Sequence, residues 1–216
     1  MTGGRQGALW VRPPGPVSPG LRIGLLGGSF NPPHAGHLHV SQVALDHLGL
    51  DYVWWLVSPQ NPLKPVAGMA PLDERVVQAR ALAHHPRIRV SALESELGTQ
   101  FTIDTLHALK RRFPSVRFVW LMGSDNLKDF QRWRRWQDIA ALVPIVVVVR
   151  PGSTLAPLYA KVAQRLARAR RSDWRHIADA PPPALAVIDA PRSEMSSTAI
   201  RERLLRAIVS AGRPRR

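Results

Sequence analysis

Short apolar runs alternate along this chain with stretches in which apolar residues recur every three or four positions. Each run is only a few residues long, which is the length of a buried strand rather than of a helix. The run PIVVVV (144–149) is apolar throughout, as expected of a strand that is buried on both faces of a parallel sheet. Six strands are predicted in this way, at residues 23–26, 52–57, 88–90, 116–122, 144–149 and 185–189.

The stretches with helical spacing predict helices between these strands. After the first strand, Val40, Val43, Ala44 and Leu48 form one apolar stripe. Strands that alternate with helices predict an α/β fold, namely a doubly wound, mainly parallel, Rossmann-like sheet with right-handed crossovers and a ligand site at the strands' carboxyl ends. Further helices are predicted over 71–85, from near Thr102 onward, over 156–171 and within 193–209.

Length and composition define the domain organisation. The 216 residues, 45% of them hydrophobic, suit one domain with a sizeable core. Residues 1–20 are rich in glycine and proline and lack a secretory apolar region, so we expect a disordered leader, a single domain over 21–212 with a helical C-terminal part, and a basic tail over 213–216. No apolar run approaches the ~20 residues that span a bilayer. The absence of cysteine excludes disulfides and thiol chemistry and fits a cytoplasmic protein.

The charge of the chain raises the question of a nucleic-acid partner. Thirty lysines and arginines against fifteen acidic residues give a formal net charge of +15, which attracts polyanions. No recognised nucleic-acid-binding motif accompanies this charge, and the arginine clusters at 132–135 and 165–171 read as solvated helix faces. An alternative explanation for part of the positive charge is that the substrates are anionic nucleotides. We therefore expect no specific nucleic-acid partner and no membrane partner.

The most specific chemistry follows the first strand, in the segment GGSFNPPHAGH (27–37). Gly27, Gly28 and Ser29 let a phosphate approach the backbone, where the N–H groups of a helix start face it. His34 and His37 are three residues apart at that start, so both imidazoles can point to a bound phosphate. The spacing is not that of a helical zinc pair. The alternative interpretation is a helix-capping loop with two exposed histidines.

Other polar residues follow later strands or begin later helices. Lys64 stands between prolines in the loop after the second strand, which is a rigid mount for a cation. Asp125 follows the fourth strand at its carboxyl end, where open α/β sheets bind ligands. Thr102 begins a helix whose N-terminus suits a carboxylate, although Thr102, Asp125 and Ser196 could each only cap a helix. A second anion site is predicted from Ser196, Ser197, Thr198 and Arg201 near the C-terminus.

Together these segments resemble a known family. GGSFNPPHAGH closely resembles the signature of the HxGH nucleotidylyltransferases, and from about Leu21 to Val209 the chain resembles the bacterial nicotinate-nucleotide adenylyltransferases within them. The segment TQFTIDTL (99–106) is similar to that family's (S/T)-x-(Y/F)-T-x-x-T-L segment, and MSSTAIR (195–201) to its I-S-S-T-x-I-R signature. Asn31 stands where many relatives have aspartate, and Met195 where the signature has isoleucine. Both departures leave the phosphate-site donors in place.

The resemblance implies an activity: adenylyl transfer from ATP to nicotinate mononucleotide, giving nicotinate adenine dinucleotide and pyrophosphate in NAD biosynthesis. It implies Mg²⁺ carried by the ATP phosphates and no metal site on the protein. The catalytic residues it implies are His34, His37, Lys64 and Arg201. The ATP-binding residues it implies are Gly27, Gly28, Ser29, Phe30, His34, His37, Gly123, Asp125, Ser196, Ser197, Thr198 and Arg201. The mononucleotide-binding residues it implies are Asn31, Lys64, Thr102 and Trp133, with the indole stacked on the pyridine ring.

Three alternatives stay open on the sequence. A sister nucleotidylyltransferase, acting on phosphopantetheine or using CTP, would share the histidine motif without needing Trp133 or the Thr102 segment. A class I aminoacyl-tRNA synthetase-like enzyme would need a KMSKS-type loop and a tRNA-binding appendage, and the sequence shows neither. A basic nucleic-acid-binding module would release no pyrophosphate. The sequence leaves the oligomeric state open, a homo-oligomer included.

Overall fold

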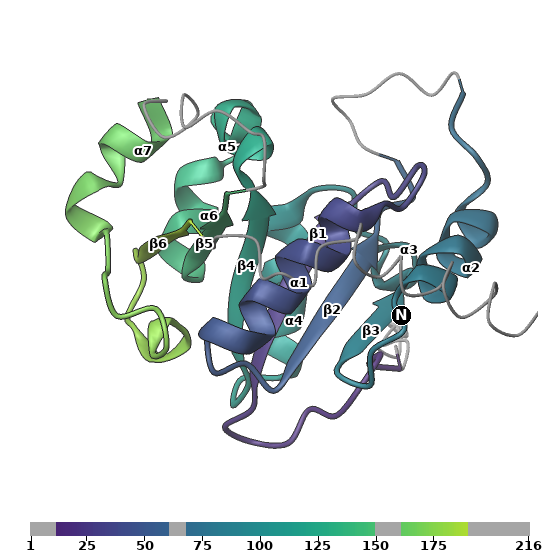
Figure 1. Cartoon of the computed structure of the whole chain (residues 1–216), viewed down its shortest axis with the longest axis horizontal. Helices are drawn as coiled ribbons and strands as arrows, with labels where there is room; N and C mark the ends of the chain where they lie inside the picture. The colour runs from purple at the N-terminus through teal and green to yellow at the C-terminus, as the bar shows by residue number, and fades with distance from the viewer. Residues whose placement is uncertain (1–11, 61–67, 150–160, 190–216) are drawn as a thin grey trace, which may run out of the picture.

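The fold is built on one sheet (Figure 1). In this computed structural model the described residues are 12–60, 68–149 and 161–189. The strands are β1 Arg22–Gly28, β2 Tyr52–Val57, β3 Ile88–Ser91, β4 Arg117–Gly123, β5 Ile145–Val148 and β6 Leu185–Ile188. They lie in the order β3-β2-β1-β4-β5-β6, and every neighbouring pair is parallel. This is the strand order of a doubly wound dinucleotide-binding sheet, so the predicted fold class is confirmed.

Both faces of the sheet are buried, which explains why its strands read as continuous apolar runs. Along β2, Trp54 and Leu56 belong to one core cluster, whereas Val53, Trp55 and Val57 belong to a second one. Successive strand residues point to opposite faces, so these are the two sides of one sheet. A strand that is covered on both sides has no polar face, so its sequence does not alternate between apolar and polar residues.

Helices cover the two faces. The helices are α1 Ala35–His47, α2 Leu72–Leu82, α3 Leu93–Leu97, α4 Thr102–Arg112, α5 Ser124–Phe130, α6 Trp136–Leu142 and α7 Lys161–Arg165, and the 3₁₀ turns are η2 Ala167–Ala169 and η3 Ile177–Asp179. The buried apolar residues of α1 join the core cluster of Trp55, and those of α4 and α6 join that of Trp54. Figure 1 shows α2 beside β3, and α5, α6 and α7 gathered near β5 and β6.

Some helix predictions need correction. The sequence predicts one basic helix over 156–171, but the described part of this segment holds the short α7, then η2, and then a bridge between Arg170 and Leu185. Helices α3, α5 and α6 were not predicted, because five to seven residues are too few to repeat an apolar stripe. Helix α4 begins at Thr102 as predicted, but Phe101 is its N-cap residue and no side chain caps it.

The N-terminal segment contacts the domain before residue 21. Val17 packs against the core cluster that contains Trp54. The backbone N–H of Gly20 donates a hydrogen bond to the carbonyl of Ser115 at 2.8 Å. The packed part of the chain therefore begins ahead of Leu21, within the stretch that composition assigns to a leader, while residues 1–11 lie outside the described residues.

The centre of the sheet determines where a ligand can bind. Strands β1 and β4 are neighbours, with Leu25 opposite Trp120, although β2 and β3 come between them in the sequence. After β1 the chain crosses to β2 on one side, and after β4 it crosses to β5 on the other. The loops beyond the carboxyl ends of β1 and β4 therefore separate, which opens a crevice at the topological switch point.

Gly27 has a packing role at this point. A Cβ built on Gly27 would lie 2.6 Å from the Cη2 atom of Trp120, which is closer than real Cβ contacts come. The Trp120 side chain is buried and lies on β4, so its ring cannot withdraw easily. A Cβ on the adjacent Gly28 would meet only Phe30 ring atoms at 3.6 and 3.7 Å and His37 Nε2 at 4.0 Å. Of the two glycines, Gly27 is thus required for strand packing and Gly28 is open to the crevice.

We predict that Gly27→Ala lowers the free energy of unfolding by about 1–3 kcal/mol, the usual cost of an extra methyl group in a packed core. Gly28→Ala is the matched control one residue away, and we expect it to change this free energy by less than about 0.5 kcal/mol. Urea denaturation followed by circular dichroism measures both variants. Equal losses in the two variants would contradict this difference between the glycines.

Candidate active site

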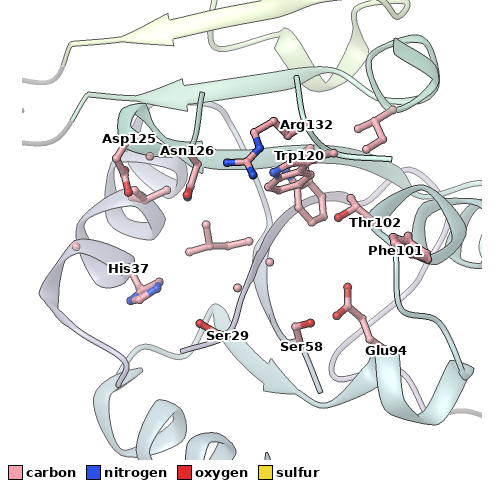
Figure 2. A pocket seen from close by; sticks show the side chains of 18 of the residues that line it. Ser29, His37, Ser58, Glu94, Phe101, Thr102, Trp120, Asp125, Asn126 and Arg132 are labelled. Atoms are coloured by element: carbon pink, nitrogen blue, oxygen red, sulfur yellow. The ribbon is translucent and has the colours of Figure 1, made fainter. Parts of the chain in front are cut away.

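A cavity of about 310 Å³ occupies the crevice at the switch point, within the ~300–1,000 Å³ range of small-molecule sites. It is lined by the loop after β1, the start of α1, the end of β2, α3, the start of α4 and the segment after β4. In Figure 2, His37, Asp125 and Asn126 lie toward one end of the cavity. Glu94, Phe101 and Thr102 lie toward the other end, so the two ends differ in chemistry.

The two histidines form a reciprocal cap at the start of α1. His34 is the N-cap residue, and its Nδ1 accepts a hydrogen bond from the backbone N–H of Gly36 at 3.1 Å. The Nδ1 of His37 accepts in return from the backbone N–H of His34 at 3.2 Å. The ring centroids lie 3.9 Å apart. The helix-capping interpretation and the ligand-site interpretation therefore describe the same residues, because both histidines also line the cavity.

This cap fixes which nitrogen of each neutral imidazole carries the proton. A ring nitrogen that accepts a hydrogen bond is unprotonated, so the proton of neutral His34 and of neutral His37 sits on Nε2. The Nε2 atom of His37 lies 4.0 Å from the Cβ position of Gly28, at the open side of the loop. His37 can therefore present an N–H donor to an anion that rests on this loop.

The loop between β1 and α1 is held in place by the buried side chain of Phe30. Phe30 has a positive φ of 48°, a strained conformation for an aromatic residue, and its side chain is buried. Its ring stacks on Trp55 at 5.1 Å and lies 4.4 Å from the ring of His37. Trp55 Nε1–H donates to Ser41 Oγ at 2.7 Å, and that hydroxyl donates to the carbonyl of His37 at 2.9 Å. Phe30 thus supports the histidine without lining the cavity.

Asn31 connects the loop after β1 to the segment that precedes α2. Its Nδ2 donates to the carbonyl of Gly68 at 3.0 Å, and its Oδ1 accepts from the backbone N–H of Ala70 at 3.2 Å. Both ends of the amide are therefore engaged with the segment that precedes α2. Asn31 is exposed and does not line the cavity.

Arg75, a buried residue of α2, holds together the loop after β1 and both ends of the loop between β2 and α2. Its guanidinium donates to the backbone carbonyls of Ser29 at 2.6 Å, Ser58 at 2.7 Å, Pro59 at 3.0 Å and Ala70 at 2.9 Å. Only 1% of its surface is exposed, and burial lowers the pKa of its guanidinium. The guanidinium remains charged, since arginine is not deprotonated in proteins. Its hydrogen bonds fix the loop after β1 relative to the loop after β2.

The segment after β4 forms the facing wall. Gly123 is the N-cap residue of α5, and Asp125 and Asn126 lie in its first turn. Asp125 is half-buried and lines the cavity, as do Gly123 and Asn126. Their place at a strand's carboxyl end agrees with the expectation from the sequence.

The other end of the cavity combines a helix start with aromatic rings. Phe101 and Thr102 are the N-cap and first residues of α4, where backbone N–H groups lack helical partners. Trp133 is half-buried, and its ring packs edge-on against Trp120 at 5.9 Å and Phe130 at 5.2 Å. The guanidinium of Arg134 lies over the ring of Phe101 at 4.6 Å. This end therefore offers N–H donors, an indole and a cation.

Several residues that line the cavity were not predicted from the sequence. Glu94, Ser58 and Asn126 all follow the carboxyl end of a strand, and the rule that placed Asp125 could have found them. Glu94 is buried, with only 4% of its surface exposed. Burial raises the pKa of its carboxyl to about 7, while hydrogen bonds from Ser58 and Thr105 act in the opposite direction.

The structure brings together most of the predicted site residues that it describes. Those lining the cavity are Gly27, Gly28, Ser29, His34, His37, Thr102, Gly123, Asp125 and Trp133. The predicted residues outside the described ranges are Lys64, Ser196, Ser197, Thr198 and Arg201.

Among the described residues, no group of three or more histidine, aspartate or glutamate side chains could hold a metal ion. None of the helices over these ranges has the length and apolar content needed to cross a bilayer.

Comparisons with known proteins agree with this geometry. The model of the cytidylyltransferase-like family matches residues 25–203. A protein of Parvibaculum lavamentivorans named "Probable nicotinate-nucleotide adenylyltransferase" is 55% identical over 190 residues, covering 87% of this chain and 94% of its own. A protein of the same name from Agrobacterium fabrum is 48% identical and covers 83% and 97%.

Solved structures show the same fold. The nicotinic acid mononucleotide adenylyltransferase of Plasmodium falciparum, solved in complex with NaAD, aligns with a TM-score of 0.60 over 84% of this chain and 83% of its own. Its complex with APC aligns with a TM-score of 0.58. The sequence identities are 18% and 17%, so these two alignments establish the architecture alone.

Proposed function

Because this chain belongs to the cytidylyltransferase-like family, and within it to the nicotinate-nucleotide adenylyltransferases, we propose that it transfers the adenylyl group of ATP to nicotinate mononucleotide. The products are nicotinate adenine dinucleotide and pyrophosphate, and the reaction serves NAD biosynthesis. The nucleotide substrates bind in the cavity at the carboxyl ends of β1 and β4.

The observation that carries this proposal is the pairing of two chemically different ends in one cavity. The end at His37 offers N–H donors on a glycine loop, which suits a polyphosphate. The end at Thr102 and Trp133 offers a helix start and an indole, which suit an aromatic cation that carries a carboxylate. Joining two nucleotides requires one ligand at each end, with their phosphates meeting between them.

The chemistry needs little help from acids or bases. The phosphate of the mononucleotide attacks the α-phosphorus of ATP in line, and pyrophosphate leaves. The second pKa of a phosphate monoester is about 6, so the nucleophile is already ionised at neutral pH. The task of the protein is to hold the reactants in line and to stabilise charge on the transferring and leaving phosphates.

His34 and His37 supply this charge stabilisation through Nε2–H donors, together with backbone N–H groups around Gly28 and Ser29. Asp125 and Gly123, at the facing wall, hold the ribose of ATP. Mg²⁺ enters with ATP as part of the substrate, since this ion usually keeps several waters and binds through phosphates. Lys64 and Arg201, and the serine and threonine hydroxyls of residues 196–198, lie outside the described residues, and their contacts with the triphosphate stay predictions.

At the acceptor end, backbone N–H groups at Thr102 receive the nicotinate carboxylate and Trp133 receives the pyridine ring. The ring of Trp133 is held by Trp120 and Phe130, so its orientation is set before the ligand binds. Asn31 contributes by fixing the segment before α2, since its amide already has two backbone partners.

The proposal is tested by measuring pyrophosphate release from Mg-ATP with a panel of acceptors. The panel is nicotinate mononucleotide, nicotinamide mononucleotide and 4′-phosphopantetheine, with CTP replacing ATP in a parallel series. We expect the highest kcat/KM for ATP with nicotinate mononucleotide. Preferential turnover of phosphopantetheine would instead assign the chain to a sister activity.

A second prediction separates the two roles of His37. In His37→Asn the amide Oδ1 can replace Nδ1 as the acceptor for the His34 N–H, but nothing replaces Nε2. In His37→Gln the amide nitrogen can replace Nε2, but the cap is lost. We expect kcat/KM to fall about a hundredfold in His37→Asn, which is the cost of one lost charge-stabilising donor. The free energy of unfolding of this variant should equal that of wild type.

In His37→Gln we expect a smaller loss of kcat/KM and a free energy of unfolding lower by about 1 kcal/mol, the usual cost of a lost helix cap. Turnover is measured by pyrophosphate release and stability by urea denaturation. If a folded His37→Asn protein turned over at the wild-type rate, the Nε2–H donor of His37 would have no part in catalysis.

A third prediction concerns Trp133. Stacking and cation–π contact with a pyridinium ring contribute about 1–2 kcal/mol when the ring is partly desolvated. Trp133→Ala should therefore raise KM for nicotinate mononucleotide about tenfold while KM for ATP barely changes. Initial rates with each substrate varied in turn give both constants. An equal rise in both KM values would make Trp133 a packing residue.

A further inference from the structure

Glu94 is a buried carboxylic acid that faces the acceptor end of the cavity. It lies in the first turn of α3, directly after β3, and lines the cavity with only 4% of its surface exposed. Figure 2 shows its side chain pointing into the cavity between Ser58 and Thr102. The mechanism derived above gives this group no role. A carboxyl group buried in the wall of a binding cavity is a candidate for a role in ligand binding.

The hydrogen bonds of Glu94 come from hydroxyl groups. Its Oε1 accepts from the Oγ1 of Thr105 on α4 at 3.4 Å, and the Thr105 hydroxyl lies 2.8 Å from that of Thr99. The hydroxyl of Ser58, at the end of β2, donates to the carbonyl of Gln60 at 3.1 Å, and its interaction with the Glu94 carboxyl lowers the pKa of that group. The backbone carbonyl of Glu94 accepts from the N–H of Thr99 at 2.9 Å, which ties α3 to the segment before α4.

The elements packed against Glu94 bring no cation to its carboxyl. Helix α3 packs against β2 and α4. The cavity-lining residues of these two elements and their ends are Ser58, Phe101 and Thr102, none of them ionisable, and Asp104 and His107 of α4 are not among the lining residues. Glu96, on the same helix, is exposed. The ionisable groups that line the rest of the cavity are His34, His37, Asp125, Arg132 and Arg134. Among the described residues, none of these forms an ion pair with Glu94.

Burial without a cation favours the neutral acid, and the pKa of Glu94 is accordingly raised to about 7. The carboxyl is therefore protonated below about pH 7 and ionised above it. Neutral Glu94 has an O–H to donate, whereas ionised Glu94 can only accept hydrogen bonds. The same side chain thus presents opposite hydrogen-bonding properties on the two sides of neutral pH.

We propose that Glu94 is a specificity-determining residue whose protonation state sets the preference between an acid and an amide on the pyridine ring of the acceptor. This inference rests on the proposed function, because it places the ring substituent at the Thr102 end. Neutral Glu94 donates its O–H to the carboxylate of nicotinate mononucleotide, forming a charge-assisted hydrogen bond. Ionised Glu94 repels that carboxylate and accepts from the NH₂ group of nicotinamide mononucleotide instead.

The test compares the two acceptors over a range of pH. For wild type, the ratio of kcat/KM with nicotinate mononucleotide to kcat/KM with nicotinamide mononucleotide is measured from about pH 6 to about pH 9. Titration of the acceptor phosphate and of ATP affects the reactions with both acceptors alike, so it cancels in the ratio. We expect the ratio to fall at least about tenfold across this range, with the change arising in KM for the acceptors and not in KM for ATP.

Glu94→Gln is the decisive variant, because its amide cannot ionise and still offers an N–H donor. We expect its acid-to-amide ratio to be independent of pH, and its activity with nicotinate mononucleotide to exceed that of wild type at the alkaline end. Glu96→Gln, an exposed change on the same helix, is the matched control and should reproduce the wild-type profile.

Ser58→Ala gives an independent check. The hydrogen bond from Ser58 lowers the pKa of Glu94, so its removal should move the midpoint of the profile to higher pH. A flat ratio in active wild type, or a pH-dependent ratio that persists in Glu94→Gln, would overturn the inference. Failure of the proposed function looks different, because neither mononucleotide would then release pyrophosphate at any pH.

Discussion

The guanidinium of Arg75 sets the distance between the loops that follow β1 and β2, and the phosphate end of the cavity depends on that distance. The four hydrogen bonds of its guanidinium all go to backbone carbonyls, so these bonds depend on the course of the main chain and not on particular side chains. A buried cation satisfied only in this way is costly to disturb, because displacement of one loop would leave guanidinium N–H groups without hydrogen-bond acceptors in a low-dielectric environment. The loop carrying Ser29 is therefore held in place before any ligand arrives.

This rigidity explains how a glycine-rich loop can serve as a binding surface. The loop contains a strained Phe30 and a histidine pair that depends on a short helix cap. The ring of Phe30 stacks on Trp55, and the carbonyl of Ser29 in the same loop accepts a hydrogen bond from Arg75, so two contacts hold the loop in place. Preorganised donors of this kind stabilise developing charge without the cost of reorganising at the moment of reaction.

Much of the fold could be predicted from the sequence, because its strands are continuous apolar runs and a parallel sheet leaves few alternatives. The positions of β2 and of the first residue of α4 agree with the pattern to the residue. Helices α3, α5 and α6 could not be predicted, since they are short and are formed by packing between longer elements rather than by an apolar stripe. The predicted basic helix over 156–171 was wrong in its described part because arginine spacing alone does not say where a helix ends.

Some residues of the candidate site could be predicted from the sequence, and others depend on packing that the sequence does not reveal. His34, His37 and Asp125 could be found because each stands in a recognisable motif or at a strand end, whereas Trp133 was predicted only through the resemblance to the family. Glu94 follows the end of β3, so the same strand-end rule could have placed it, but its burial could not be read from the sequence. Arg75 could not be found, because an arginine in a helix of mixed polarity is normally solvated. Burial is decided by the packing of segments distant in sequence, such as α2 on the loops after β1 and β2.

The pairing of β1 with β4 also has a consequence for biosynthesis. Strand β1 begins at residue 22, but its second neighbour begins only at residue 117, so the central strand of the finished sheet is an edge while the nascent chain is incomplete. An exposed apolar edge strand is a template for pairing with other chains. At that stage the histidine loop can already have formed, yet the wall that carries Asp125 and Trp133 is still missing. During synthesis, β1 is therefore open to pairing with other chains until β4 has been made.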